Sequence, residues 1–285
     1  MSVAMRVACI QMRSGMQEQA NIDEMERLVA KAAGQGAAYV QTPEMTGILQ
    51  RNRAALFSEI SGDKDNPVFS SASRLAKRHG IWLHVGSTAV DLGHGKAANR
   101  AALFAPSGER AATYDKIHMF DVDLDKGESW RESAVFSPGD QAVVCPVGDA
   151  TFGLAICYDL RFPALFLAQA VAGATVLTCP AAFTRQTGEA HWHVLLRARA
   201  IENGAFVIAA AQGGRHEDGR ETFGHSLVID PWGTIIAELD HDKPGILVCD
   251  IEPAQSRAAR AKIPNLANRR GFSAPQHSDA SRGAA

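Results

Sequence analysis

Short apolar runs with the character of buried strands alternate with helical patterns along most of this chain. The strand-like runs are residues 6–11, 38–41, 81–86, 100–104, 111–114, 142–145, 152–156, 175–178, 206–211, 227–229, 234–238 and 246–249. The helical patterns are residues 22–33, 68–78, 164–172 and 188–203. Because strands joined through helices form βαβ units, this order predicts an α/β fold whose two halves have a similar rhythm.

The size of the chain allows one large domain. It has 285 residues, of which 46% are hydrophobic and 21% charged, and no linker-like segment divides it before its last residues. We expect residues 1–272 to form a single domain and the polar residues 273–285 to form a flexible tail. Residues 109–138 have little periodicity and many charges, and a long connection of this kind is usually functional. Asn21, followed by Glu24, predicts the N-cap of the first helix.

Charge and composition indicate a small-molecule partner and a cytoplasmic location. A net charge of −2 lacks the basic excess of a nucleic-acid-binding protein, and no apolar run is long enough for a membrane span or a signal peptide. The five cysteines are odd in number and lie mostly in strand-like runs, so disulfides are not expected. No Cys-x-x-Cys occurs, and His191 and His193 lack a third ligand nearby in sequence, so neither a metal nor another cofactor is predicted.

Cys157 stands where an apolar run meets a polar turn. Asp159 and Pro163 follow it and are typical of the start of a helix. At such a junction the next backbone N–H groups can face developing negative charge, which suits a nucleophile. The alternative is structural, because a free cysteine is often only a small buried hydrophobic residue.

Two charged residues also follow predicted strands, Glu44 after residues 38–41 and Lys116 after residues 111–114. The carboxyl ends of strands in an α/β sheet face one crevice, so Glu44, Lys116 and Cys157 can meet there. Each taken alone fits a solvated loop residue equally well. A Cys–His pair is the other way to activate a thiol, but none of the histidines follows a papain-like or caspase-like signature.

The three segments Pro43-Glu44, Asp115-Lys116-Ile117-His118 and Gly153-Leu-Ala-Ile-Cys157-Tyr-Asp159 together resemble the signatures of the nitrilase superfamily of carbon–nitrogen hydrolases, in the same order. The resemblance extends over residues 6–270. The runs after Lys116, Cys157, Gly188 and Gly224 resemble the Nit branch, which contains deaminated glutathione amidases and ω-amidases. The resemblance implies a four-layer αββα sandwich and a homodimer, or a higher homo-oligomer, that pairs through the helix over residues 164–172.

The resemblance also implies a mechanism. Cys157 attacks an amide carbonyl, Glu44 is the general base, and Lys116 stabilises the tetrahedral oxygen together with the backbone N–H of Tyr158. For this role the pKa of Glu44 is expected to lie above that of a free Glu, as burial would produce. Glu132 matches a fourth polar position of the family and Glu128 is its solvated alternative. Arg161 is a candidate for a substrate carboxylate, or for an ion pair with a neighbouring Asp.

Further pocket residues follow from position. Phe183, Thr184 and Thr187 precede or begin the helix near residue 188, so they either line the pocket or serve only as loop and cap residues. The branch-level runs favour hydrolysis of deaminated glutathione; α-ketoglutaramate, nitriles and N-carbamoyl compounds are the alternatives. A thiol phosphatase or redox protein is disfavoured because Arg161 lies too near Cys157 for a phosphate loop and no resolving cysteine lies nearby. A silent binding protein is disfavoured by the intact Glu44, Lys116 and Cys157. The sequence departs from its relatives at Ala164 and Asn268, which puts only local anchoring in doubt.

Overall fold

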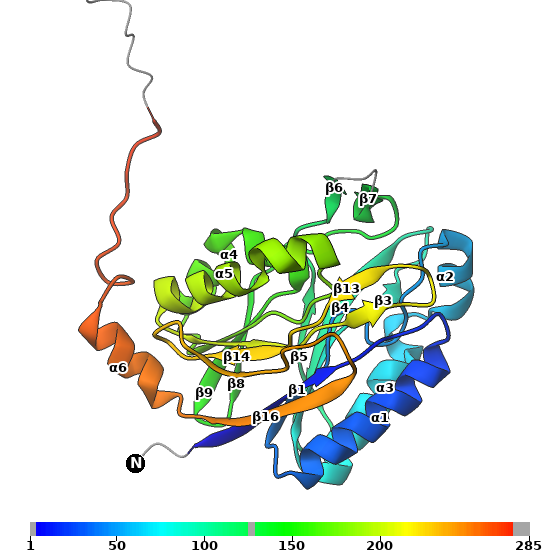
Figure 1. Cartoon of the computed structure of the whole chain (residues 1–285), viewed down its shortest axis with the longest axis horizontal. Coiled ribbons are helices and arrows are strands. Elements are labelled where there is room, and N and C mark those ends of the chain that lie inside the picture. Colours follow the sequence, from blue (N-terminus) through cyan, green and yellow to red (C-terminus); the bar gives the residue numbers. More distant parts are fainter. Residues whose placement is uncertain (1–3, 125–128, 276–285) are drawn as a thin grey trace, which may run out of the picture.

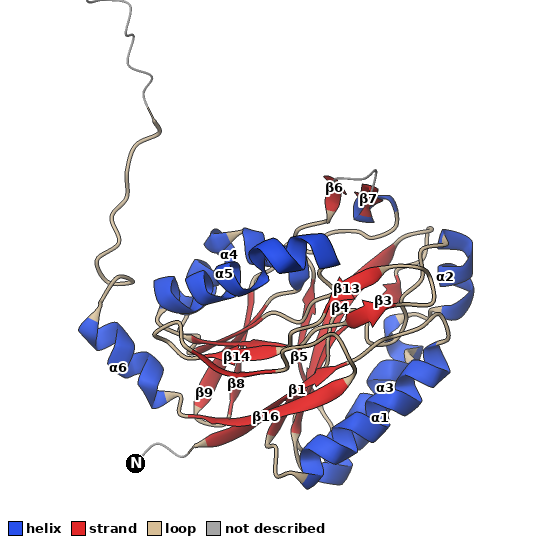
Figure 2. Ribbon diagram, viewed as in Figure 1, coloured by secondary structure: helices blue, strands red, loops and turns tan. Residues whose placement is uncertain are grey.

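The computed structural model describes residues 4–124 and 129–275, and in it two β-sheets lie face to face between two layers of helices. Figure 1 shows the two sheets stacked in the centre, with α1 and α3 on one side and α4 and α5 on the other. Figure 2 gives the same view by element type. The predicted four-layer αββα sandwich is therefore confirmed.

The first sheet joins both ends of the folded chain. Its strands, in spatial order, are β16 (Gly245–Ile251), β1 (Met5–Gln11), β2 (Tyr39–Gln41), β3 (Trp82–Asp91), β4 (Ala97–Phe104) and β5 (Arg110–Asp115). β1, β2 and β3 are parallel to one another, as the βαβ pattern predicts, and the remaining pairs are antiparallel. Parallel strands end at the same edge, so the segments that follow β2 and β3 leave the sheet side by side.

The second sheet repeats this plan. Its strands, in spatial order, are β15 (Ile235–Glu238), β14 (Leu227–Ile229), β11 (Phe206–Ala209), β10 (Val176–Thr178), β9 (Ala150–Leu154) and β8 (Val143–Val147). The three central strands β9, β10 and β11 are parallel, and the outer pairs are antiparallel. The similar rhythm of the two halves thus reflects two sheets of the same construction.

Helices cover the outer face of each sheet. The helices are α1 (Glu18–Gly34), α2 (Arg53–Glu59), α3 (Pro67–His79), α4 (Pro163–Val171), α5 (Arg185–Asn203) and α6 (Ala254–Lys262). One core packs α1 and α3 on the first sheet, and a second packs α4 and α5 on the other. A third core lies between the sheets, where the Tyr39 and Phe152 rings are 4.6 Å apart. Strands buried on both faces explain why their sequences are almost continuously apolar.

The first helix begins earlier than its sequence indicates. α1 starts at Glu18, so Asn21 lies inside the helix and is not its N-cap. The Asn21 side chain instead accepts a hydrogen bond from the N–H of Gly15 at 2.7 Å and donates one to the carbonyl of Gly47 at 2.8 Å. The amide that was expected to cap the helix therefore fastens it to two loops.

The sequence pattern did not predict several short elements. These are α2, α6, the hairpin of β6 (Asp121–Asp123) and β7 (Ser129–Arg131), the hairpin of β12 (Gly213–Arg215) and β13 (Glu221–Phe223), and the 3-10 turns η1 (Asp63–Asp65), η3 (Glu132–Ala134) and η4 (Cys157–Arg161). Three-residue strands are too short to show a period of two. The β6–β7 hairpin and η3 occupy the long connection that was expected to be functional.

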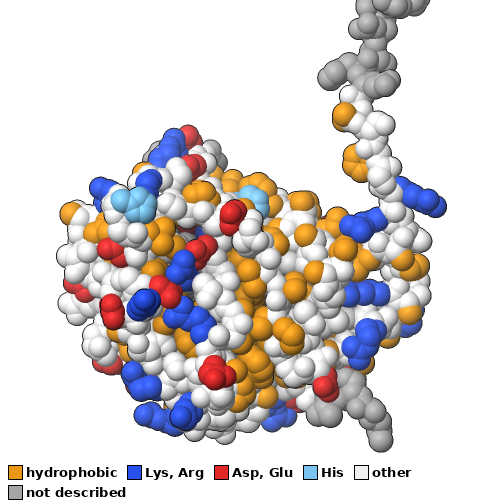
Figure 3. Space-filling model, turned by 180° about the vertical axis from the view of Figure 1, so that it is seen from behind, with side chains coloured by type: hydrophobic (Ala, Val, Ile, Leu, Met, Phe, Trp, Pro, Cys, Tyr) orange, Lys and Arg blue, Asp and Glu red, His pale blue; other side chains and the backbone are white. Residues whose placement is uncertain are grey.

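Beyond α6 the chain leaves the body of the molecule, as Figure 1 shows. Ser273–Pro275 are exposed and lie in neither a helix nor a strand, while residues 276–285 of the predicted tail lie outside the described residues. Figure 3, the view from behind, shows this projecting segment beside a face on which hydrophobic side chains gather in the middle. In the part of the chain that the structure describes, no helix has the length and apolarity to cross a bilayer.

Candidate active site

The ends of strands from both sheets bring Glu44, Lys116 and Cys157 into one pocket. Glu44 follows β2, Lys116 follows β5 and Cys157 follows β9 by way of two further apolar residues. All three line a cavity of about 280 Å³ and are at most 6% exposed. The structure therefore brings together the three residues that the sequence singled out, and none of the described histidines lines this cavity.

The Lys116 ammonium lies between two carboxylates. Its Nζ is 2.9 Å from Oε1 of Glu44, and 3.0 and 2.9 Å from Oε1 and Oε2 of Glu132. Glu132 begins η3, directly after the β6–β7 hairpin, and it lines the same cavity. Its alternative, Glu128, lies outside the described residues. A buried ammonium needs such partners, because an unpaired charge in this position would be strongly destabilising.

Further donors complete the hydrogen bonding of both carboxylates. Asn99 on β4 donates to Oε1 of Glu44 at 2.9 Å and to Oε1 of Glu132 at 3.1 Å. The backbone N–H of Ala182 donates to Oε2 of Glu44 at 2.8 Å, and that of Phe120 to Oε2 of Glu132 at 2.7 Å. Sequence reasoning missed Asn99, because a polar residue inside a strand belongs to no recognisable motif. Its only signal is that Asn99, together with Arg100, interrupts a strand whose other residues are apolar.

The charges of the cluster differ from the expectation for Glu44. Burial acts to raise the pKa of Glu44, but the Lys116 charge and hydrogen bonds from Cys157, Lys116 and Asn99 outweigh it, so this pKa lies below its usual value. The expected rise is therefore wrong. Burial also acts to lower the pKa of Lys116, but the charges of Glu132 and Glu44 raise it well above its usual value. The resting cluster thus holds an ionised glutamate beside an ammonium.

The Cys157 thiol is protonated in this setting. Burial, followed by the nearby Glu44 charge, raises its pKa well above the ordinary value, and Lys116 opposes the rise only in part. A protonated thiol next to an ionised carboxylate is a donor and acceptor pair. Proton transfer from sulfur to Glu44 must therefore accompany the attack of the sulfur on a substrate.

Cys157 adopts a left-handed backbone conformation. Its φ is +50°, it begins the 3-10 turn η4, and its N–H donates to the carbonyl of Pro180 at 2.9 Å. A non-glycine residue with positive φ is strained and persists only where its surroundings fix it. The predicted helix does begin with Pro163, but η4 separates it from Cys157. Tyr158, whose N–H was expected to face the substrate oxygen, is the next residue of this turn.

Asp159 fixes that turn. Its fully buried carboxylate accepts hydrogen bonds from the Tyr114 hydroxyl at 2.6 Å and from the Ile156 N–H at 2.8 Å, both on Oδ2. Its Oδ1 accepts from the His118 N–H at 3.1 Å and lies 2.7 Å from Nδ1 of the same residue. Tyr114 and His118 flank Lys116 in sequence. One side chain therefore connects the Lys116 segment of the first sheet to the Cys157 turn of the second.

The predicted substrate-binding residues all line the cavity. Arg161 donates to Nδ1 of His191 at 3.2 Å, its guanidinium carbon lies 5.5 Å from the centre of the Phe183 ring, and no aspartate among the described residues forms the alternative ion pair with it. Thr184 is both a wall residue and the N-cap of α5, because its hydroxyl accepts from the N–H of Thr187. Thr184 thus combines a place in the cavity wall with the capping of α5.

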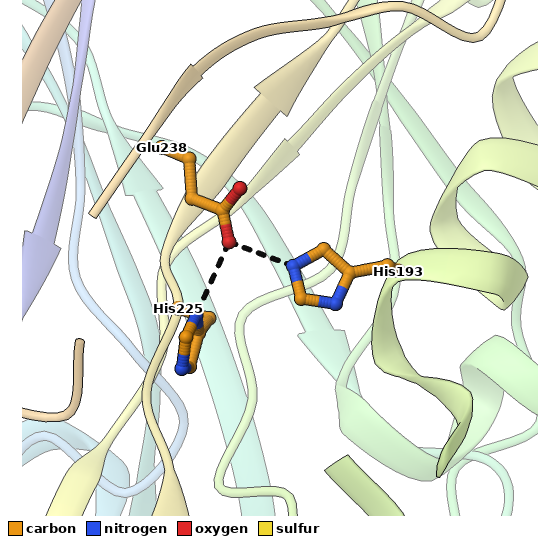
Figure 4. A group of neighbouring side chains, drawn as sticks. All are labelled: His193, His225 and Glu238. Atoms are coloured by element: carbon orange, nitrogen blue, oxygen red, sulfur yellow. Dashed lines mark hydrogen bonds and ion pairs between the residues drawn. The ribbon is translucent and has the colours of Figure 1, made fainter. Parts of the chain in front are cut away.

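A separate polar cluster lies outside the cavity, where Glu238 on β15 meets two histidines (Figure 4). Its Oε1 is 2.7 Å from Nε2 of His193 and 3.2 Å from Nδ1 of His225. Both partners are distant from His193 in sequence and His191 is not part of the cluster, so the group is formed by the fold and not by the His191 and His193 pair. These contacts connect α5 to the second sheet.

The fold and the cluster at the strand ends define a class of enzyme that comparison with known proteins identifies. The family model described as carbon-nitrogen hydrolase matches residues 6–261, and the chain belongs to this family. It is 39% identical over 282 residues to a protein from Yersinia enterocolitica named deaminated glutathione amidase, covering 96% of each chain.

Solved structures agree with this placement. The crystal structure of the C. elegans NitFhit protein has a TM-score of 0.86 at 30% identity, covering 94% of this chain and 66% of that chain. A mutant of the amidase from Nesterenkonia sp. AN1, with the acetamide moiety of fluoroacetamide added covalently at its active site cysteine, has a TM-score of 0.79 at 29% identity. That comparison covers 93% of this chain and 94% of the other.

Proposed function

We propose that this chain is an amidase that hydrolyses deaminated glutathione through a thioester on Cys157. One observation carries the chemistry: a protonated thiol and an ionised Glu44 share a buried pocket with the Lys116 ammonium. The similarity to the Yersinia protein of that name supports the substrate. Deaminated glutathione is the tripeptide with a keto group in place of its glutamyl amine, so it carries a carboxylate at each end.

In the first half of the reaction, Sγ of Cys157 forms a bond to the amide carbonyl carbon while its proton passes to Glu44. The negative charge that develops on the carbonyl oxygen is stabilised by the Lys116 ammonium and the backbone N–H of Tyr158. The C–N bond then breaks, and the departing amine takes the proton from Glu44. The acyl group remains on sulfur as a thioester.

In the second half, water attacks the thioester carbon and gives a proton to Glu44. The C–S bond breaks, the proton returns to sulfur, and the acid is released. The low pKa of Glu44 suits both halves, because the resting carboxylate is already ionised. Glu132 is a positioning residue here, since it holds the Lys116 ammonium through both of its oxygens.

The walls provide the groups that a keto-acid acyl chain needs. Arg161 lies four positions after Cys157 on the same turn, and we assign it the carboxylate of the acyl half. Phe183, Thr184 and Thr187 line the same cavity and form the surface against which the acyl chain packs. The acyl half bound in this way is that of 2-oxoglutarate.

Intact-protein mass spectrometry tests the chemistry. Deaminated glutathione should yield an adduct with the mass of the 2-oxoglutaryl group on the wild-type chain, and peptide mapping should place it on Cys157. The Cys157→Ala variant should carry none, whereas Cys145→Ala, which removes a buried thiol outside the cavity, should acylate normally. Absence of both adduct and product amine with wild-type protein would refute the proposal. Turnover of only α-ketoglutaramate, a nitrile or an N-carbamoyl compound would instead identify one of the alternative activities.

We further propose a homodimer that pairs through the outer faces of α4 and α5. Support comes from apolar side chains that these helices leave in solvent, with Val171 49%, Val194 68% and Ile201 52% exposed. The five free cysteines suit the reducing cytoplasm, where we place the protein. We also retain residues 1–272 as one catalytic domain, which the family match over residues 6–261 supports. Sedimentation velocity of a Val194→Glu variant tests the dimer.

A further inference from the structure

More cationic side chains line the cavity than the proposed reaction requires. Two carboxylates line it, Glu44 and Glu132, and both contact Lys116. The cationic residues that line it are Arg51, Lys116, Arg131, Arg161 and Arg220. Arg131 is paired with Asp123 at 2.8 Å. The guanidinium groups of Arg51, Arg161 and Arg220 have no such close carboxylate among the described residues: Arg161 contacts His191, and Arg220 lies 3.5 Å from Asp218.

Arg220 is held in the cavity with incomplete hydrogen bonding. It precedes β13, and only 17% of its side chain is exposed. Its Nε is buried and has no hydrogen-bond partner among the described residues, and Nη2 is 3.5 Å from Oδ2 of Asp218, longer than a charge-assisted hydrogen bond. A buried guanidinium with unused donors is costly to the fold. An anionic ligand would recover that cost.

A second guanidinium shares a ring with Arg220. The Arg51 guanidinium carbon is 4.2 Å from the centre of the Trp130 ring, and that of Arg220 is 4.5 Å from the same ring. Arg51, Trp130 and Arg220 come from three separate segments: the loop before α2, strand β7, and the turn between β12 and β13. Among the described residues Arg51 forms no ion pair. Two like charges held at one ring in a cavity wall form a site for a carboxylate.

We propose that Arg51, Trp130 and Arg220 form a second anion site, which binds the carboxylate on the amine half of the substrate. Arg161, on the turn of Cys157, serves the acyl half, so the enzyme selects amides that carry a carboxylate on both sides of the cleaved bond. This inference rests on the proposed amidase function and adds to it the class of leaving group. Simple primary amides, whose leaving group is ammonia, use only the Arg161 site.

The test compares three substrates in three variants. The substrates are deaminated glutathione, its C-terminal glycinamide analogue and α-ketoglutaramate; the variants are Arg51→Gln, Arg220→Gln and Arg215→Gln. Arg215 is the matched control, an exposed arginine of the same β12–β13 hairpin that does not line the cavity. Thermal melting checks that Arg220→Gln folds, and Arg51, which is exposed, gives a variant without that risk.

Loss of a charge-assisted contact predicts that Arg51→Gln and Arg220→Gln lower kcat/KM for deaminated glutathione about 10- to 100-fold, mainly through KM. Both variants should keep wild-type kcat/KM for the glycinamide analogue and for α-ketoglutaramate. An equal loss for all three substrates, or no loss for any, overturns the second anion site and leaves the amidase function intact. A wild-type chain that hydrolyses none of them overturns both proposals.

Discussion

The floor and the rim of the cavity differ in how completely their charges are satisfied. On the floor, Glu44, Lys116 and Glu132 form contacts of 2.9 to 3.0 Å, and Asn99 donates to both carboxylates. At the rim, the described residues offer no hydrogen-bond partner to Nε of Arg220 and no ion-pair partner to Arg51, whose guanidinium lies over the ring of Trp130. Glu44, Lys116 and Asn99 lie on or after strands of the first sheet, whereas Glu132 and the rim residues belong to short hairpins, turns and loops.

This difference indicates that the floor residues carry out the reaction and that the rim residues recognise the substrate. The ammonium and both carboxylates of the floor are paired, so the groups that act on the bond are held in place before the substrate arrives. Hydrogen-bond donors that are unsatisfied at the rim gain the most from a ligand. Contacts at the rim should therefore decide which substrates bind tightly. Changes to the floor should therefore reduce kcat, whereas changes to the rim should alter KM and the choice of substrate.

Among changes to the floor and the rim, Lys116→Met should have the largest effect on kcat/KM. It removes the ammonium that both carboxylates share, and kcat/KM should fall by at least about 100- to 1000-fold for every amide tested. Lys31→Met, at an exposed position of α1, is the control and should behave as wild type. Steady-state kinetics checks this. A substrate-selective loss would show that Lys116 belongs to recognition and not to the chemistry.

Asp159→Asn should come next, because it breaks the connection between the two sheets at the floor. Asn keeps one acceptor oxygen, so either the Tyr114 and Ile156 donors or the His118 N–H must face an amide nitrogen that cannot accept, and we expect a loss of about 1–3 kcal/mol in unfolding free energy and a lower kcat. Denaturant unfolding and kinetics measure the two effects. Asp149→Asn, in the exposed β8–β9 turn, is the control. Unchanged stability would mean that the turn of Cys157 is fixed by other contacts.

Asn99→Leu should alter the pH dependence of the floor. Glu44 must be ionised to act as a base, and its lowered pKa predicts that kcat/KM stays level as pH falls to about 4.5 and is lost only below that. Removal of the Asn99 donor raises this pKa, so the acid limb should move to higher pH, with a much smaller change in kcat/KM near neutrality. The pH profile of kcat/KM is the measurement. A limb that does not move would exclude Glu44 as the titrating base.

The smallest expected effect concerns Glu18, a buried carboxyl group that lies outside the cavity and for which no ligand is proposed. Burial and the Glu59 charge raise the pKa of Glu18, at the start of α1, to about 7, and its Oε1 has no described hydrogen-bond partner. Because the pKa of Glu18 is raised on folding, the folded chain favours the protonated carboxyl group. The contribution of this group to the free energy of unfolding is therefore complete at low pH and is lost as the pH rises through 7. Glu18→Gln should raise the unfolding free energy at pH 8 by about 1 kcal/mol, with little change at pH 4. Thermal unfolding of both proteins at pH 4 and pH 8 measures the difference. An equal change in stability at both pH values would contradict a raised pKa for Glu18.

The floor was predictable from sequence to a greater extent than the rim. Glu44, Lys116 and Cys157 each follow a strand of one of the two sheets, and strand ends in such a fold converge. The lowered pKa of Glu44 was not predictable, because it depends on the balance between burial and contacts from Lys116 and Asn99. Arg51, Trp130 and Arg220 gave no signal, since short loops and hairpins have no period and their packing depends on the whole fold.

The positive φ of Cys157 has a consequence for how this protein can change. Glycine adopts that conformation without strain, so Cys157→Gly is one of the few replacements in the core expected to relieve strain in the folded chain. Function and folding therefore impose opposite preferences at one position. A lineage released from the need for the reaction would gain stability by losing its nucleophile first.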